Sequence, residues 1–225
     1  MEEIIRHIAD GFRAASLLDQ ANLALGIIGV GLMIRRTLWA FPVGLVAVVV
    51  QGVLFFRETF YADATLQVFF FATLAWGWRH WVRDRGAAPE LPVARLTGRG
   101  WAWTLGLAGL ATVAWALAAQ AWTDTRMPWR DAFIAAFSVA AQVLQARKQL
   151  ENWPLWIAVN TVAIVSYWSA ELAFTAFLYA VYLALAFMGW RTWRKAMVDT
   201  MRPEGANGNA PHAAAGENER AGETR

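Results

Sequence analysis

The chain has 225 residues, of which 58% are hydrophobic and 16% are charged, with a net charge of +3 and no cysteine. The missing cysteines exclude disulfide scaffolds, thiolate metal sites and cysteine nucleophiles. The three histidines lie among polar or charged neighbours, which argues against a histidine metal site or a catalytic triad. The basic residues flank apolar segments instead of forming a soluble basic face, so we expect a membrane protein and no nucleic-acid partner.

Residues 1–17 have the pattern of an amphipathic helix at a membrane surface, because isoleucines and Phe12 alternate with charged residues at helical spacing. A cleaved signal peptide would need a longer apolar region and a cleavage site. We therefore expect an N-terminal amphipathic segment that precedes the membrane domain.

Seven stretches without any Asp, Glu, Lys, Arg or His follow, and together they predict an all-α integral membrane protein with seven transmembrane helices within residues 18–195. The first, third and fifth stretches have only about 15 residues, so each must borrow flanking residues to cross the bilayer. From residue 203 onward no large apolar residue occurs, which predicts a disordered tail over 196–225. The stretches are 21–34, 39–56, 64–78, 101–122, 132–146, 153–170 and 172–190.

The basic residues predict the orientation, because loops rich in Lys and Arg remain in the cytoplasm. With seven spans, five Lys and Arg residues lie on the N-terminal side and thirteen on the other side, before the two in the tail. We therefore expect the N-terminus outside and the C-terminus in the cytoplasm. Six spans would scramble this separation.

An internal repeat divides the membrane domain. Residues 35–81 align with residues 147–193 at a shift of 112 positions, without a gap and with twelve identities. A Gly-Trp-Arg-x-Trp sequence ends both halves. The alignment predicts a repeat over 18–82, a linker helix over 100–122 and a second repeat over 129–195. Parallel repeats of this kind occur in transporters, with the substrate site between them near the middle of the membrane.

The repeated Gly-Trp-Arg-x-Trp sequence is most simply interpreted as an interfacial anchor. Its tryptophans are expected at the cytoplasmic surface of the bilayer, with the two arginines extending to lipid headgroups. These residues are Trp78, Arg79, Trp81, Trp190, Arg191 and Trp193.

The sixth stretch differs from its repeat counterpart. Trp153, Trp156, Asn160 and Tyr167 fall within a stripe about 60° wide on a helix, whereas their counterparts Phe41, Gly44, Val48 and Phe55 carry no polar group. An asparagine in mid-membrane is costly against lipid, so Asn160 is expected to face the helix bundle. The alternative is that Asn160 only joins two helices and that the tryptophans are interfacial.

Four further polar residues within the stretches are candidates for the same site: Gln67, Gln142, Tyr179 and Tyr182. With the stripe they outline a neutral pocket that stacks a flat ring and hydrogen-bonds hydroxyl or amide groups. Without charged or histidine side chains there, we expect no proton relay, no carboxylate cation site and no phosphate site. The same absence argues against an enzyme and against a metal or other cofactor.

Two segments carry a family resemblance: residues 147–160, RKQLENWPLWIAVN, and residues 60–71, FYADATLQVFFF. They hold a W-x-x-W motif at Trp153 and Trp156 and an N-x6-Y motif at Asn160 and Tyr167. With these motifs at this spacing, the chain from about residue 23 to 195 resembles the PnuC-type vitamin transporters. Pro154 departs from the aliphatic residue more usual in this motif, which puts the Trp156 rotamer in question.

The resemblance implies a SWEET-like 3+1+3 arrangement of seven helices, a homotrimer, and a place in the bacterial cytoplasmic membrane. It also implies facilitated diffusion of nicotinamide riboside for NAD biosynthesis, with a cytoplasmic kinase trapping the cargo as its phosphate. Members that carry thiamin or riboflavin share this framework, so these cargoes remain alternatives, as does a non-transporting membrane scaffold. The candidate substrate-binding residues are Gln67, Gln142, Trp153, Trp156, Asn160, Tyr167, Tyr179 and Tyr182.

Overall fold

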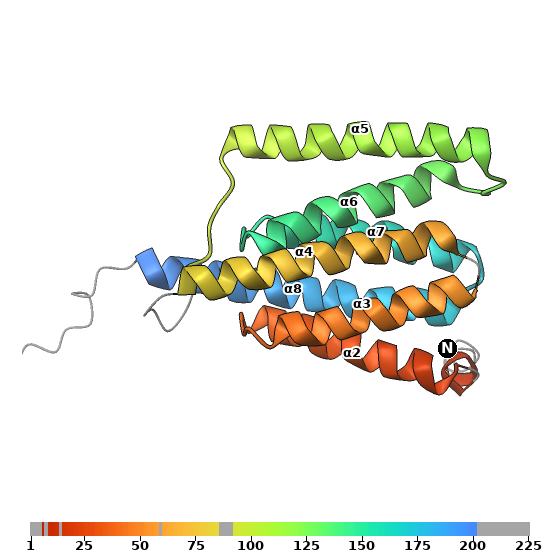
Figure 1. The fold of residues 1–225 in the computed structure, drawn as a ribbon, viewed down its shortest axis with the longest axis horizontal. Coiled ribbons are helices and arrows are strands. Elements are labelled where there is room, and N and C mark those ends of the chain that lie inside the picture. The colour runs from red at the N-terminus through yellow and green to blue at the C-terminus, as the bar shows by residue number, and fades with distance from the viewer. Residues whose placement is uncertain (1–5, 7–8, 14, 59, 86–91, 202–225) are drawn as a thin grey trace, which may run out of the picture.

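The computed structural model describes residues 6, 9–13, 15–58, 60–85 and 92–201 (Figure 1). Seven long helices account for nearly all of these residues. Within the expected N-terminal amphipathic segment, residues 6 and 9–13 are helical, and its other residues up to position 14 lie outside the described part. The long helices are α2 (Leu17–Ile34), α3 (Ala40–Arg57), α4 (Tyr61–Arg85), α5 (Gly98–Trp122), α6 (Pro128–Ala146), α7 (Asn152–Ser169) and α8 (Ala173–Met201).

Each of the seven uncharged stretches lies inside one of these helices to within one residue at its ends, and the three short stretches extend into their polar flanks. Local caps explain two starts. The Ser16 hydroxyl accepts a hydrogen bond from the Asp19 N–H at 3.2 Å, and the Asp19 carboxylate accepts one from the Ser16 N–H at 3.0 Å, which is a capping box. Thr97 Oγ1 caps α5 in the same way by accepting from the Gly100 N–H at 3.1 Å.

Four of the helices, α2, α3, α5 and α8, are long and apolar enough to cross a membrane on length and composition. The other three are less apolar for visible reasons. The last turns of α4 are charged, α6 begins with Arg130 and Asp131, and α7 carries Asn160 among its tryptophans.

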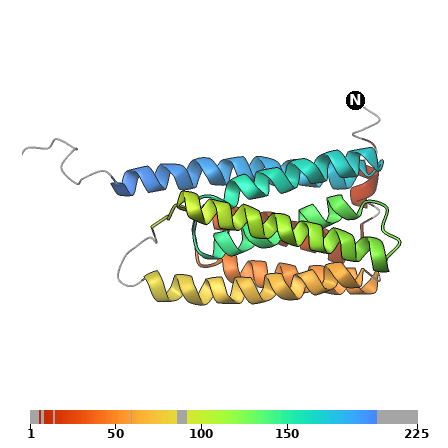
Figure 2. The same cartoon turned by 90° about the horizontal axis from the view of Figure 1, so that it is seen from above.

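The helices form two three-helix units that close into a ring. Helices α2, α3 and α4 pack together, as do α6, α7 and α8, and the units meet where α4 contacts α6 and α2 contacts α8. Helix α5 lies at one edge and packs mainly on α6 (Figures 1 and 2). Helices α2 and α6 begin at the same end of the bundle, so the units run parallel (Figure 1).

The two units share their backbone geometry at the shift of 112 residues. The first and last residues of α3 and α7 are equivalent at this shift. The loops that precede these helices match as well, because Arg36 and Lys148 both take a left-handed conformation, with φ of 57° and 56°. We call the end of the bundle with these two loops the inner end and the opposite end the outer end.

Helix α8 continues to Met201, so the expectation that the tail begins at residue 196 is wrong. Met197 lies one turn beyond Trp193 and joins the same buried cluster, which gives the helix a reason to continue. The rest of the expected tail, residues 202–225, lies outside the described residues.

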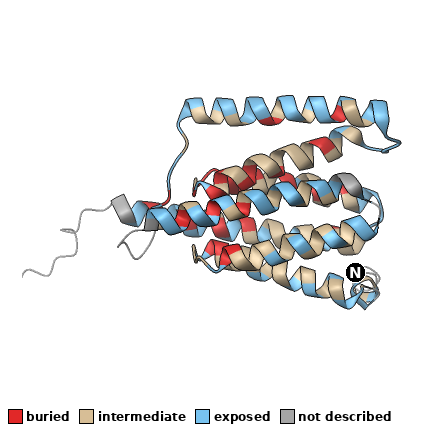
Figure 3. Ribbon diagram, in the orientation of Figure 1, coloured by how far each residue is buried: buried red, intermediate tan, exposed pale blue. Residues whose placement is uncertain are grey.

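Buried side chains gather toward the inner end of the bundle (Figure 3). The largest are Phe41, Trp81, Trp153 and Trp193, which we call the aromatic cluster. Trp81 and Trp193 are only 1% and 0% exposed, so the expectation that they anchor the membrane surface is wrong. The other tryptophan of the first signature, Trp78, is exposed as expected.

The aromatic cluster repeats the symmetry of the helices. Phe41 meets Trp81 edge-on with ring centroids 5.0 Å apart, and the equivalent pair Trp153 and Trp193 meets edge-on at 5.4 Å. Trp81 and Trp193, one from each pair, have ring centroids 6.1 Å apart and join the two units. Such tilted arrangements match the electrostatics of aromatic rings.

The buried indoles also exchange hydrogen bonds between the units. Trp81 Nε1 donates to the Ala146 carbonyl at 2.9 Å, and Trp193 Nε1 donates to the carbonyls of Met33 and Ile34 at 3.2 Å each. Ile34 and Ala146 are equivalent positions, each the last residue of the first helix of its unit. Each unit therefore satisfies a helix end in the other.

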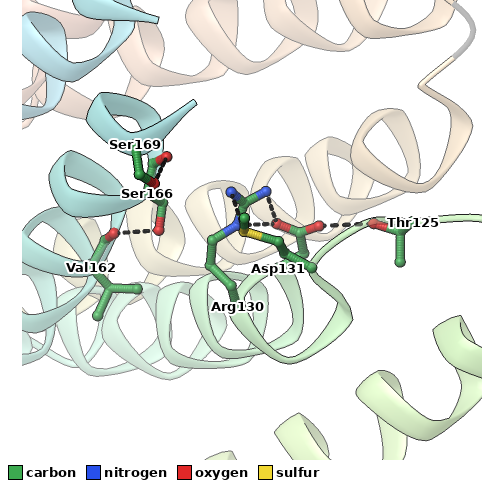
Figure 4. A network of polar contacts seen from close by, with 7 residues as sticks. Thr125, Arg130, Asp131, Val162, Ser166 and Ser169 are labelled. Carbon is green, nitrogen blue, oxygen red and sulfur yellow. Dashed lines mark hydrogen bonds and ion pairs between the residues drawn. The ribbon is translucent and has the colours of Figure 1, made fainter. Parts of the chain in front are cut away.

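At the outer end, polar contacts fix the start of α6 (Figure 4). Asp131 accepts hydrogen bonds from Arg130 Nε at 2.9 Å and from the Thr125 hydroxyl at 3.1 Å. The α5–α6 connection is thereby tied to the first turn of α6.

Candidate functional site

A cavity of about 650 Å³ lies between the two three-helix units. Helices α2, α3, α4, α6, α7 and α8 all line it, and Gly11, Phe12 and Ala15 line it beside the outer-end residue Asp19. At the inner end it reaches Trp153 of the aromatic cluster. Its volume lies in the range of small-molecule sites, about 300–1,000 Å³.

Six of the eight candidate substrate-binding residues line this cavity. Within the stripe on α7, Trp153 and Asn160 are only 2% and 5% exposed, whereas Val165 on the opposite face is exposed. The role of the six cavity-lining candidates in substrate binding stays a prediction. The six are Gln142, Trp153, Trp156, Asn160, Tyr179 and Tyr182.

The two tryptophans of the W-x-x-W motif are held differently. Trp156 Nε1 donates to Gln145 Oε1 at 3.0 Å, which fixes the indole against the wall formed by α6. Trp153 is held by packing, since a Cβ atom at Gly189 would lie 2.4 Å from its ring. The Trp153 N–H has no hydrogen-bond acceptor among the described residues. Pro154, between them, lies in the first turn of α7, where a missing N–H is harmless.

Tyr167 and Gln67 do not line the cavity. Tyr167 stacks on Tyr179 with ring centroids 5.2 Å apart, so it supports a lining residue from behind. Gln67 packs over Gly52 of α3 and lines a separate groove between α3 and α4 with exposed apolar residues such as Val53. Gln67 and Tyr179 are equivalent positions at the shift of 112 residues, but Gln67 lines this groove and Tyr179 lines the cavity.

Several polar lining residues were missed by the sequence reasoning: Asn22, Gln51, Ser138, Gln145 and Thr175. Asn22 Nδ2 donates a hydrogen bond to Gln51 Oε1 and joins α2 to α3. The signal that identified Asn160, a polar residue inside an uncharged stretch with an apolar repeat counterpart, applies equally to Gln51.

The cavity is almost free of charge. Among its described lining residues, Asp19 is the one Asp, Glu, Lys, Arg or His side chain, and it lies at the outer end within the capping box of α2. No group of His, Asp and Glu suited to a metal ion occurs in the part of the chain that the structure describes. The arrangement can stack an aromatic ring and hydrogen-bond neutral polar groups.

Comparisons with known proteins place these features in a family. A model of the nicotinamide mononucleotide transporter family matches residues 16–195. The chain is 31% identical to the riboflavin/roseoflavin transporter RibM of Streptomyces davaonensis, over 78% of this chain and 83% of that protein. It is 26% identical to the nicotinamide riboside transporter PnuC of Escherichia coli, over 86% and 92% of the two chains.

A crystal structure of the vitamin B3 transporter PnuC has the same fold, with a TM-score of 0.69 over 87% of this chain and 90% of that chain at 20% identity. The family match covers all seven long helices except the end of α8 beyond residue 195, and most of the residues that line the cavity. The chain therefore belongs to the nicotinamide mononucleotide transporter family, as a multi-pass membrane transporter of the PnuC type and not an enzyme.

Proposed function

We propose that this protein carries an aromatic, hydroxylated and unphosphorylated vitamin into the bacterial cytoplasm by facilitated diffusion, with nicotinamide riboside as the first candidate. The observation that carries the proposal is the nearly uncharged cavity between the units, which Trp156 lines together with the amides of Asn160 and Gln142. The pyridinium ring of nicotinamide riboside is cationic, so an indole face would attract it by about 0.5–2 kcal/mol. The amides would bind its carboxamide or hydroxyls.

The nearly uncharged cavity also supports passive transport of the cargo, without coupling to an ion. Helices α2–α4 and α6–α8 would rock about the cavity as two parallel repeats of a SWEET-like 3+1+3 fold, with α5 as the linker helix. A proton relay or a carboxylate cation site needs an ionisable side chain near the substrate, and Asp19 at the outer end is the one described Asp, Glu, Lys, Arg or His that lines the cavity.

Transport into liposomes tests the mechanism. The purified protein should equilibrate labelled nicotinamide riboside across the membrane without responding to imposed proton or Na⁺ gradients. Accumulation driven by either gradient would overturn uniport. The Asn160→Leu variant should lose at least about tenfold in binding affinity, because a buried amide contact disappears. Wild-type protein that binds none of the vitamins would favour the scaffold alternative.

Riboflavin is the second candidate, and the 31% identity to RibM favours it. Its flat ring and hydroxylated chain suit the same neutral cavity. Titration of the wild-type protein with nicotinamide riboside, riboflavin and thiamin separates the candidates, since the physiological cargo should bind most tightly. Tightest binding of riboflavin would replace nicotinamide riboside in the proposal and leave the mechanism unchanged.

Three further parts of the proposal concern the cellular setting. We place the protein in the cytoplasmic membrane, coupled without contact to a kinase that traps the cargo, and as a homotrimer. Helix α5 packs mainly on α6 and leaves Trp103, Leu107 and Leu110 exposed, so this face is available to lipid or to a neighbouring copy. Mass measurement of the detergent-solubilised protein checks the trimer, and a monomeric mass would refute it.

A further inference from the structure

The wall that the first three-helix unit gives to the cavity is apolar except near its outer end. There Asn22 of α2 donates a hydrogen bond to Gln51 of α3, and both half-buried side chains line the cavity. Deeper in the same wall stand Val30, Val48 and Leu74. The amide pair therefore lies between the polar outer end of this wall, which Asp19 and Gln20 also line, and its apolar deeper part.

The pair is not needed to hold its two helices together. The equivalent positions in the second unit are Ile134 and Ala163, and α6 packs on α7 there without a matching hydrogen bond. Two amides within a membrane domain are costly unless they serve each other or a ligand. Since the same helix pair packs with Ile and Ala in the second unit, the amides point to a ligand.

The level of the pair in the bundle complements that of the tryptophans. Gln51 is equivalent to Ala163, which lies seven residues beyond Trp156 on α7, or about 10 Å along the helix axis. Trp153 and Trp156 lie toward the inner end, and the amide pair lies toward the outer end. An elongated molecule with a ring at one end and a polar chain at the other would contact both.

The remaining hydrogen-bonding capacity of the pair matches hydroxyl groups. Their mutual bond uses one donor of Asn22 and one lone pair of Gln51, which leaves the Asn22 carbonyl oxygen and the Gln51 NH₂ group. A hydroxyl both donates and accepts, so neighbouring hydroxyls can use both groups. Neither side chain carries the positive charge that a phosphate would require.

On the basis of the proposed function, we propose that Asn22 and Gln51 form the subsite that binds the hydroxylated chain of the cargo. The cargo then lies along the bundle axis with its ring toward Trp156 and its sugar or sugar-alcohol chain toward the outer end. The pair determines specificity, because it favours vitamins that carry such a chain over the free ring systems.

Two substitutions test the subsite without disturbing the packing. Asn22→Ile and Gln51→Ala each install the residue that the second unit already carries at that position. Gln67→Leu is the matched control, since it removes an amide of the same unit that lies outside the cavity. Each variant is compared with wild type by elution volume and thermal unfolding in detergent, so that a folding defect is recognised separately.

Binding is measured for two ligand pairs that differ in the hydroxylated chain. Nicotinamide riboside is compared with N-methylnicotinamide that is methylated at the ring nitrogen, and riboflavin is compared with lumiflavin. In Asn22→Ile and Gln51→Ala, affinity for the chain-bearing vitamin should fall about fivefold to tenfold, while affinity for the chainless ring should change less than about twofold. Gln67→Leu should change neither affinity.

Equal losses for the vitamin and its chainless ring, or no loss for either, would overturn the subsite and leave the proposed function standing. Wild-type protein that binds neither vitamin would overturn both. If one cavity variant fails to fold, the other one and the ligand comparison in wild type still decide. Wild type that binds lumiflavin and N-methylnicotinamide as tightly as the vitamins would contradict the inference by itself.

Discussion

At the scale of single residues, the indole N–H groups of Trp81 and Trp193 decide how the inner end is held. The last carbonyls of a helix have no partner within the helix, and burying them unpaired is costly. Trp193 Nε1 donates to Ile34 and Trp81 Nε1 donates to Ala146, so each bond satisfies a buried helix end. Tryptophan suits this position because its large apolar ring carries one donor and no acceptor, whereas the tyrosine hydroxyl also carries an acceptor.

We therefore expect Trp193→Phe to lower the free energy of unfolding by about 1–3 kcal/mol, because the Ile34 carbonyl loses its indole donor, whereas the Met33 carbonyl still accepts from the Arg36 N–H. Trp190→Phe is the control, since Trp190 belongs to the same signature but is not among the fully buried side chains. Thermal unfolding in detergent measures both variants. Equal stability of the two would contradict the assigned role.

The glycines of the repeated signature lead to a second residue-scale prediction. A Cβ atom at Gly189 would lie 2.4 Å from the ring of Trp153, which lines the cavity. Gly189→Ala should therefore displace Trp153 and weaken vitamin binding by about tenfold or more. At Gly106 of α5 no atom lies within 4 Å of the added Cβ, so Gly106→Ala should leave binding unchanged. Isothermal titration of both variants checks the difference, and unchanged affinity in Gly189→Ala would refute it.

At the scale of elements, the segment before α5 is strapped to the second unit. Ala94 exchanges backbone hydrogen bonds with Lys148 and Leu150, and the buried Glu151 carboxylate accepts one from the Leu96 N–H at 2.9 Å. These bonds hold the segment before α5 beside the loop that leads into α7. The first unit has Trp39 where the second has Glu151, so the strap is one-sided.

Glu151→Ala should release this strap, because the Leu96 N–H loses its acceptor. We expect faster hydrogen exchange over residues 93–97 and a stability loss of about 1–3 kcal/mol. Exchange measured by mass spectrometry checks the prediction, with Glu171→Ala at an exposed loop position as control. The strap would be refuted by equal exchange in wild type and Glu151→Ala.

The elements were largely predictable from sequence, because apolar stretches of membrane length have few alternatives to a helix. The seven stretches and the shift of 112 residues anticipated the helices and their pairing in the two units. The length of α8 was underestimated, because the charged residues Arg194 and Lys195 suggested a helix end although Met197 beyond them is buried. Charge at a helix end does not distinguish a membrane boundary from a helix that projects beyond it.

The site was only partly predictable, because one helix pattern does not reveal its neighbours. The α7 stripe pointed to Trp156 and Asn160, since their face could be computed within a single helix. Whether Gln67 faces the cavity or a lipid-side groove depends on the packing of α4 against α3, which no local pattern contains. The burial of Trp81 and Trp193 likewise depends on contacts between units.

At the scale of the whole molecule, the bias of basic residues predicts an outer N-terminus and a cytoplasmic C-terminus. The absence of native cysteine makes this testable with single-cysteine variants. In intact cells, a membrane-impermeant thiol reagent should label Asp124→Cys in the α5–α6 connection and should not label Arg83→Cys near the end of α4. The reverse pattern would invert the topology, and labelling of both after lysis is the control.

The reciprocal indole bonds set an order of events during synthesis. When the first three helices enter the membrane, the Trp81 N–H and the Ile34 carbonyl have no partners, because both partners belong to the second unit. Ala146 emerges next, and Trp193 emerges last among the four groups. These two groups of the first unit therefore stay without their native partners until the second unit is made, and the ring closes only when the chain is almost complete. A chain terminated before Trp193 would leave the Ile34 carbonyl at the end of α2 without this indole donor.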